Sequence, residues 1–372
     1  MVFHPPRIPT SNVELEKRAL LCGICYSRAK TRQQSCTRAA NGTLKGPHHD
    51  VLACKEMLMD IYSYPKENIV IMMDDNDTPE DSDLLPTRAN MLTQLERFVQ
   101  RDKPNVQYFF LYAGHSEQIE CQDGTEEDGM NECLVPMDAT EILDLDRELT
   151  NEDVERMVMD DDLKRLLADR LPPTCKLTAV MDTCHSATLL DLFHHRCNRI
   201  SRPSSSGRRI VRKANELAGQ LKSMVHRDSA TNQAIFRVHQ IMSAYAIPRE
   251  IEFCDGLHCL RLRWSSTGRQ PSMICISACK DGENSWENPN DGSGSLTMAL
   301  VNILRTESKP ILKTLMRKLS SELDGQHDKM VKERQDWYRK HGGHAVLIKR
   351  RFVQNPQLST EIPADMDHFL TI

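Results

Sequence analysis

Five short apolar runs along the chain, each ending in small, polar or acidic residues, predict buried β-strands. The runs are Arg18–Tyr26, Asn68–Asp74, Val106–Ala113, Lys176–Asp182 and Met273–Ser277. Their apolar residues are continuous rather than alternating, which is typical of strands covered on both faces. We therefore expect a largely parallel sheet.

Between these runs, apolar residues recur at the spacing of an α-helix. Val51, Cys54, Leu58 and Ile61 recur at helical intervals, and a second set, Met91, Leu92, Leu95, Phe98 and Val99, follows the helix-start signal Pro86-Thr87. Alternating strands and helices predict an α/β domain built in layers. In such sheets the functional crevice lies at the carboxyl ends of the strands.

One stretch breaks the alternation. Residues 196–215 contain no acidic residue, seven arginines or lysines, and the cluster Pro203-Ser-Ser-Ser-Gly207. This composition predicts an exposed basic loop. A short patch for nucleic acid or a membrane surface is the alternative, although no aromatic residue is interleaved with the charges.

Composition narrows the class of protein. The chain has 372 residues with 39% hydrophobic and 27% charged residues, which fits a soluble globular protein. No apolar run approaches the roughly 18 residues of a membrane span, and the first residues lack a signal-peptide core. The 13 scattered cysteines favour free thiols in the cytoplasm, with the nucleus as a second compartment. A net charge of −5 argues against a nucleic-acid partner.

Two motifs that carry candidate chemistry stand at predicted strand ends. Gly114-His115-Ser116 closes the third run, and Asp182-Thr-Cys184-His185-Ser186 closes the fourth. If these strands are parallel neighbours, His115 and Cys184 project from the same edge of the sheet. An imidazole beside a thiol removes its proton for attack on a carbonyl and can then protonate the departing amine.

Other interpretations of these residues exist. A cysteine at the end of a buried strand is often a core residue, and a histidine before a loop is unremarkable. A metal site is a further alternative, since candidate ligands lie close in the sequence, but their spacing matches no structural zinc pattern. These ligands are Cys184, His185, His194, His195 and Cys197.

The motifs resemble those of metacaspases. Tyr112-Ala-Gly-His115-Ser116 is similar to their Tyr-Ser-Gly-His-Gly segment, and Asp182-Thr-Cys184-His185-Ser186-Ala187 is similar to their Asp-Ser-Cys-His-Ser-Gly segment. The resemblance runs from about Arg18 to Ser359 and is weakest near 199–270. Further matching pieces are Pro86-Thr-Arg-Ala-Asn90, Glu126-Glu-Asp-Gly129, Pro136-Met-Asp138 and Ser277-Ala-Cys-Lys-Asp281. The Gln-Ala-Cys signature of animal caspases is missing from the sequence.

The resemblance implies a fold and a domain plan. It implies a caspase-like three-layer sandwich with a mostly parallel central sheet flanked by helices. Residues 1–17 are expected to form a short arm and residues 18–372 one peptidase domain. Within that domain, 18–197 correspond to the large subunit, 198–270 bear a linker, and 271–372 correspond to the small subunit. We expect a monomer without nucleic-acid or membrane partners.

The resemblance also implies an activity. Metacaspases are cysteine endopeptidases that cut after Arg or Lys, so protein substrates with exposed basic residues are expected. His115 and Cys184 match the dyad, Asp50 and Asp182 match the acidic pocket, and the backbone N–H groups of Ser116 and Cys184 match the oxyanion hole. Self-cleavage is expected in the basic stretch, after Arg208 or Arg209.

Calcium is the cofactor that the resemblance implies. Asp160, Asp161 and Asp191 match calcium-binding carboxylates of the family. Asn131 stands where a fourth aspartate is usual, which removes one negative charge. We therefore expect stimulation by calcium through a weak site.

Several positions depart from the family pattern. Ser116 and Ala187 replace glycines, and Pro47 and Ala113 replace a cysteine and a serine of the pocket. A position that requires positive φ would strain Ser116. These differences leave a second hypothesis open, in which the chain keeps the fold but acts as a scaffold that binds other proteins.

Overall fold

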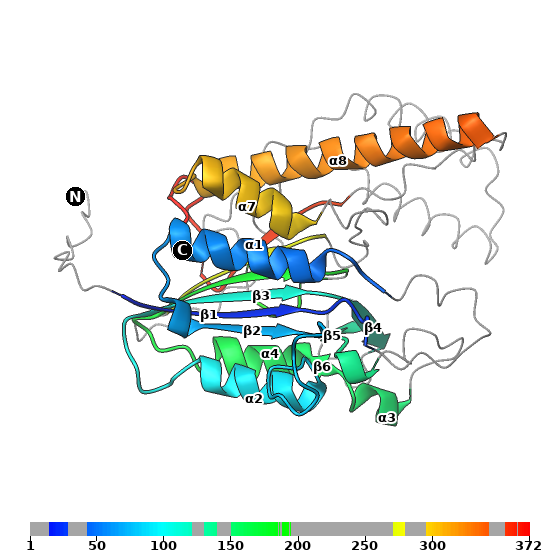
Figure 1. The fold of residues 1–372 in the computed structure, drawn as a ribbon. Coiled ribbons are helices and arrows are strands. Elements are labelled where there is room, and N and C mark those ends of the chain that lie inside the picture. The colour runs from blue at the N-terminus through cyan, green and yellow to red at the C-terminus, as the bar shows by residue number, and fades with distance from the viewer. Residues whose placement is uncertain are drawn as a thin grey trace, which may run out of the picture.

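A six-stranded sheet forms the centre of the molecule. The structure is a computed structural model that describes residues 15–28, 43–120, 130–139, 150–184, 186, 188–192, 194, 271–279, 295–341, 354–362 and 364–372. The strand order is β2-β1-β3-β7-β8-β9 (Figure 1). The strands are β1 (Glu16–Gly23), β2 (Ile69–Met73), β3 (Val106–Ala113), β7 (Lys176–Asp182), β8 (Ser272–Ser277) and β9 (Gln357–Thr360).

The five strands expected from the apolar runs are confirmed, and they pair in parallel. β1 lies between β2 and β3, and β7 lies between β3 and β8. Only β9 at the edge of this sheet runs antiparallel, against β8. β9 was not among the predicted strands because it has four residues, too few for a period to emerge.

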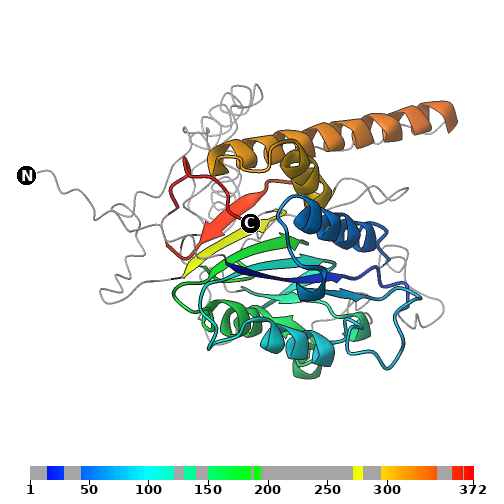
Figure 2. The same ribbon diagram turned by 60° about the vertical axis from the view of Figure 1, so that its left-hand side comes forward.

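Helices cover both faces of the sheet. α1 (Pro47–Asp60), α7 (Leu296–Thr306) and α8 (Leu312–His341) lie on one face, and α2 (Arg88–Phe98) and α4 (Asp160–Leu163) lie on the other (Figure 1). Figure 2 shows the same three layers from another side. Alternate residues of each central strand therefore enter two separate apolar cores, one under each helical layer. The α/β three-layer architecture is as predicted.

Local signals explain where the helices begin. Thr87 caps α2 by accepting a hydrogen bond from the backbone N–H of Asn90 (3.3 Å), and Ser295 caps α7 by accepting one from Met298 (3.1 Å). α1 begins with Pro47, a residue suited to the first helical position. Its close approach to β1 requires Gly23, because a Cβ atom there would lie 2.5 Å from the Pro47 carbonyl oxygen.

A second, three-stranded sheet lies at the carboxyl ends of the parallel strands. It consists of β4 (Ser116–Glu120), β5 (Met130–Leu134) and β6 (Val158–Met159), all antiparallel. The sequence analysis did not predict it, because its strands are short and β4 is largely polar. The short elements η2 (Lys66–Asn68), α3 (Asn151–Val154) and η4 (Lys164–Ala168) complete the described part.

Two further findings bear on the class of protein. Within the described ranges no helix is long and apolar enough to cross a membrane. All eight cysteines of that part of the chain are free thiols.

Candidate active site

His115 and Cys184 follow two strands that are direct neighbours in the sheet. β3 pairs in parallel with β7, and Ala113 lies opposite Asp182. His115 stands two residues after Ala113, and Cys184 stands two residues after Asp182. The structure thus brings both predicted catalytic residues to one edge of the sheet. Both are partly exposed there, as a site that receives substrate requires.

Tyr26 holds the His115 segment in position. Its hydroxyl accepts a hydrogen bond from the His115 backbone N–H (2.7 Å) and donates one to the Val135 carbonyl (2.8 Å). The two rings stack, with centroids 4.7 Å apart and planes 29° apart. Tyr26 has φ of 58°, in the left-handed region that residues with a Cβ rarely adopt. Such strain is often found at functional sites.

A second tyrosine completes this support. The Tyr112 hydroxyl donates to the His115 carbonyl (2.7 Å) and lies 3.3 Å from the Tyr26 hydroxyl. Burial raises the pKa of both phenols, so both remain protonated donors at neutral pH. Gly114 makes room for them, because a Cβ at that position would lie 2.8 Å from the Tyr112 oxygen.

Ser116 ties the two strand ends together. It is buried, its hydroxyl donates to the Cys184 carbonyl oxygen, and it accepts a hydrogen bond from the Thr183 hydroxyl (2.8 Å). Ser116 is not one of the described residues with positive φ, so its replacement of glycine causes no backbone strain. Ala187, the other departure from glycine, lies outside the described residues.

The two predicted pocket carboxylates converge on the start of α7. Asp50, in the first turn of α1, accepts a hydrogen bond from the Ser295 hydroxyl (2.7 Å). Asp182, at the end of β7, accepts from both the backbone N–H and the hydroxyl of Thr297 (2.7 Å each). Both carboxylates are buried, and both lie where the helix dipole favours negative charge.

Sequence reasoning did not identify Ser295 and Thr297 as residues of this site. The available signal was the serine cap before the apolar run of α7, which predicts a helix start but not its neighbours. The structure also accommodates the two residues that replace the family's pocket cysteine and serine. Pro47 begins α1, and Ala113 ends β3 in a buried position.

The predicted calcium residues gather near the small sheet. Asp160 begins α4, and its carboxylate accepts from the backbone N–H groups of Glu132 (2.8 Å) and Asp161 (2.7 Å). Asp191 forms an ion pair with Lys164. Burial, together with the charges of Asp161 and Asp191, raises the pKa of Asp160 to about 6 although the two N–H groups oppose the shift.

These carboxylates do not form a closed set of ligands. Asn131 lies in β5, next to Glu132, a buried acid that the sequence analysis did not single out. The oxygens of Asp160, Asp161 and Asp191 do not all lie within 4.8 Å of one another; in the described residues only Cys25, His48 and Asp74 form such a group. The Lys164 ammonium is the cation that now accompanies Asp191.

Most other candidates lie beyond the described part of the chain. His194 is buried, and its backbone N–H donates to the Thr360 carbonyl (2.9 Å). His185, His195 and Cys197, with which it was weighed as a metal site, lie outside the described residues. So do Arg208, Arg209 and the basic stretch around them.

The fold and the site together define a class. A parallel sheet between two helical layers, with a histidine and a cysteine after adjacent strands, is the arrangement of a caspase-fold cysteine peptidase. Residues 17–193 match the family described as metacaspase, peptidase C14 domain. This part of the chain is therefore a metacaspase domain, and the metacaspases are a family of cysteine peptidases.

Several known proteins are similar to this chain. Metacaspase-1 of Schizosaccharomyces pombe is 24% identical over 363 residues, which cover 96% of this chain and 70% of the relative. Metacaspase-1A of Aspergillus oryzae is 34% identical over 176 residues, 47% of this chain and 36% of the relative. Caspase-1 of Spodoptera frugiperda superposes with a TM-score of 0.41 and 9% identity, covering 93% of this chain and 86% of that one.

Proposed function

We propose that this chain is an endopeptidase that cleaves after Arg or Lys and is stimulated by calcium. Cys184 acts as the nucleophile and His115 as the acid and base. The observation that carries the proposal is the convergence of two buried carboxylates, Asp50 and Asp182, on the start of α7 beside the strand end that bears Cys184. Two acids in one pocket favour a guanidinium or ammonium side chain over a neutral one.

The chemistry follows from the residues at the sheet edge. His115 takes the Cys184 proton, and the sulfur attacks the carbonyl carbon after the basic residue, forming an S–C bond. The oxyanion is held by the backbone N–H groups of Ser116 and Cys184. The intermediate collapses with cleavage of the C–N bond, and His115 protonates the amine that leaves. Water then hydrolyses the thioester and restores the thiol.

Calcium stimulation rests on the acidic group near the small sheet. Burial and the nearby charges of Asp161 and Asp191 disfavour the negative charge of Asp160. A hard divalent cation with oxygen ligands would compensate it. With Asn131 in place of a fourth acid, the requirement should fall in the range of weak sites, roughly 10⁻⁴–10⁻³ M.

Fluorogenic peptides ending in Arg, Lys or Asp, assayed with calcium and with a chelator, test the proposal. Arg and Lys peptides should be cleaved and Asp peptides should not. Cys184→Ala and His115→Ala should each abolish turnover, and the double variant should be scarcely worse than either, because nucleophile and base act as a unit. Preference for Asp peptides would exclude the acidic pocket, and activity retained in Cys184→Ala would exclude the dyad.

A scaffold function is the second candidate. Ser116 and Ala187 depart from family glycines beside the dyad, and Ser116 makes a side-chain hydrogen bond to the Cys184 carbonyl that a glycine could not make. These departures leave open a chain that binds proteins without cleaving them. Labelling with an Arg-directed electrophile separates the two. A reactive Cys184 supports the peptidase, and an inert thiol in the folded chain supports the scaffold.

A further inference from the structure

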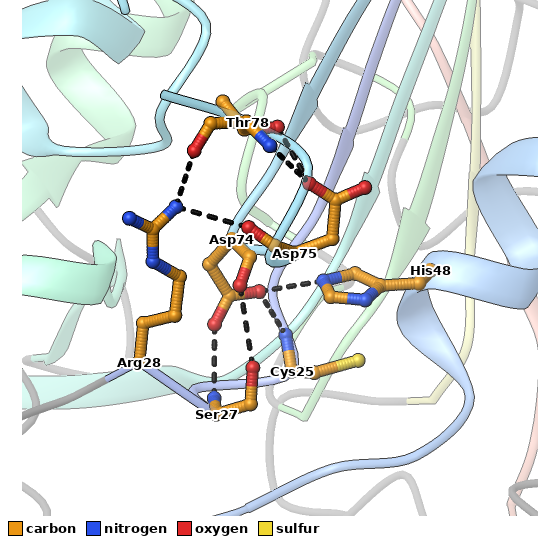
Figure 3. A network of polar contacts seen from close by, with 7 residues as sticks. All are labelled: Cys25, Ser27, Arg28, His48, Asp74, Asp75 and Thr78. Atoms are coloured by element: carbon orange, nitrogen blue, oxygen red, sulfur yellow. Dashed lines mark hydrogen bonds and ion pairs between the residues drawn. The ribbon is translucent and has the colours of Figure 1, made fainter. Parts of the chain in front are cut away.

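A cysteine, a histidine and an aspartate from three separate elements meet outside the dyad. Cys25 follows β1, His48 lies in the first turn of α1, and Asp74 follows β2. One possible ligand atom of each lies within 4.8 Å of the other two. Figure 3 shows the His48 ring reaching from α1 to the Asp74 carboxylate, with Cys25 and Ser27 on the chain that follows β1.

Hydrogen bonds orient the aspartate at this point. Asp74 is fully buried, and its two carboxylate oxygens accept from the backbone N–H groups of Cys25 (2.8 Å) and Ser27 (3.0 Å). The oxygen bonded to Cys25 also lies 2.6 Å from Nε2 of His48. Such outer contacts fix the direction of a carboxylate ligand in metal sites.

The neighbouring loops are also tied together. Arg28 donates to the carbonyl oxygens of Asp75 (2.9 Å) and Thr78 (2.6 Å), and the Asp75 carboxylate accepts from the Thr78 backbone N–H (2.9 Å) (Figure 3). The segments after β1 and β2 are thereby held at a fixed distance, so Cys25 and Asp74 are prearranged. His48 has a side chain 21% exposed, which leaves a route for an ion from solvent.

The set of donor atoms selects the kind of ion. One thiolate, one imidazole nitrogen and one carboxylate oxygen suit zinc or another borderline-soft divalent cation, whereas calcium and magnesium prefer oxygen ligands. The charges also balance. A divalent cation with one thiolate, one carboxylate and a neutral imidazole has no net charge, which reduces the cost of burial.

We propose that Cys25, His48 and Asp74 bind one zinc ion, with a fourth position open to water. Zinc takes the place of the proton between His48 and Asp74, and both this proton and the proton of the Cys25 thiol are released to solvent. Zinc bonds to nitrogen and oxygen are about 2.0 Å, so two such ligands stand roughly 3.3 Å apart. The His48 ring therefore has to move slightly away from the carboxylate, and its partial exposure allows this.

A bound ion would fasten three segments of the site's framework. Cys25 directly precedes Tyr26, whose hydroxyl holds the His115 backbone. His48 lies two residues before Asp50 in α1. An ion at this position would therefore fix the supports of both the dyad and the pocket without touching the reacting atoms.

Cobalt(II) titration of the full chain tests the site, because a cobalt–thiolate bond gives charge-transfer absorption in the near ultraviolet. The chain carries Cys184→Ala, which removes the dyad thiol and prevents self-cleavage. After treatment with a chelator, one cobalt ion should bind per chain, and zinc should displace it. Cys25→Ser should abolish the absorption, and His48→Gln should weaken cobalt affinity at least tenfold.

His49→Gln is the matched control, because His49 is the exposed neighbour of His48 on the same turn. It should bind cobalt like the parent. Zinc should also raise the Tm of the parent and of His49→Gln but not of Cys25→Ser, since an ion that binds only the folded state stabilises it. Undiminished absorption in Cys25→Ser, equal affinity in folded His48→Gln, or no binding by the parent would overturn the proposal.

Discussion

The hydroxyl of Tyr26 reaches two segments that lie far from it in the sequence, at His115 and Val135. It accepts from the His115 backbone and donates to Val135, and it is buried with the Tyr112 hydroxyl beside it. We expect it to position the segment that bears the His115 imidazole, since both of these hydrogen bonds are to backbone atoms. The sequence offers no pattern that would predict this contact.

Tyr26→Phe tests this positioning role. The ring can still stack on His115, but the hydrogen bond to the backbone N–H is lost, which costs about 1 kcal/mol and leaves a buried donor unpaired. We expect kcat to fall about tenfold with KM nearly unchanged. Tyr108→Phe is the control. Tyr108 lies in β3 and is buried like Tyr26, but its hydroxyl accepts a hydrogen bond from the backbone N–H of Gln100, away from the site. Equal kcat in both variants would exclude the role.

The two hydrogen bonds from Thr297 to the Asp182 carboxylate lead to a second prediction at the scale of residues. Asp182→Asn should reduce turnover of Arg peptides by about 2–5 kcal/mol in transition-state free energy, the range for a buried charge left unpaired. Thr297→Val keeps the carboxylate and one of its two donors, so it should cost only about 1 kcal/mol. The measurement is kcat/KM for Arg and Lys peptides. A larger loss in Thr297→Val than in Asp182→Asn would contradict the pocket assignment.

The His48–Asp74 pair predicts a pH dependence of stability in the metal-free chain. Burial acts to lower the pKa of His48, but the hydrogen bonds to Asp74 and Cys25 and the negative charge of Asp74 outweigh it and raise the pKa from 6.5 to about 10. The folded state thus binds the proton more tightly than the unfolded state. This contribution is fully present below about pH 6.5 and is lost as the pH rises through about 10.

Denaturant unfolding of His48→Gln and of the parent, both with a chelator, measures the contribution of the His48–Asp74 pair to the free energy of unfolding. The variant should be less stable than the parent by about 2 kcal/mol near neutral pH, between the values for exposed and buried ion pairs. The difference should shrink toward about pH 10. His49→Gln should match the parent throughout. A difference that does not change with pH would show that His48 stabilises by packing alone.

At the scale of elements, the positions of α4, η4 and β5 determine how the carboxylates of Asp160, Asp161 and Asp191 can bind a cation. Asp160 at the start of α4 is buried beside β5, and Lys164 at the start of η4 pairs with Asp191. The first turn of α4 contains three consecutive acids, Asp160, Asp161 and Asp162. A calcium ion would have to compete with the lysine ammonium for Asp191, in addition to lacking the fourth acid.

Two substitutions should therefore lower the calcium requirement of peptidase activity. Asn131→Asp adds a negative charge, and Lys164→Gln removes the competing ammonium. Each should shift the half-maximal calcium concentration downward by severalfold. The requirement should rise below about pH 6, where Asp160 becomes protonated. Lys318→Gln is the control, because it removes a lysine from an exposed ion pair on α8. Activity indifferent to chelator in all variants would remove calcium from the proposal.

At the scale of the whole molecule, the central sheet joins parts of the chain that a basic stretch separates. β7 ends at Asp182 and β8 begins at Ser272, yet the two strands pair in parallel along six residues. α7 then returns to β7 through the Thr297 contact with Asp182. A break in the chain between β7 and β8 would leave this sheet intact.

This pairing sharpens the prediction of self-cleavage. With calcium, the active chain should cut itself within 196–213, after Arg208 or Arg209, because a peptidase that prefers Arg finds substrate in its own basic stretch. The two fragments should copurify, since β7 and β8 remain paired. Intact-mass analysis and size-exclusion chromatography measure both effects. Cys184→Ala must stay whole, and cleavage only outside this stretch would reject the prediction.

The sequence by itself determined five of the six strands that build the central sheet. The continuous apolar runs form strands because helices cover both faces of the central sheet and bury these residues. It also determined the edge on which His115 and Cys184 lie, because parallel strands end on the same side. The family match adds the chemistry of a cysteine peptidase.

Only the tertiary structure decided which side chains support these residues. Tyr26 contacts His115 across 89 positions, Ser295 contacts Asp50 across 245, and His48 contacts Asp74 across 26. Hydrophobic periodicity reports only which face of an element is buried, and these residues lie at strand ends and helix starts, where it does not show which side chains meet. Such contacts depend on how helices and loops pack at the carboxyl edge of the sheet, which local patterns do not encode.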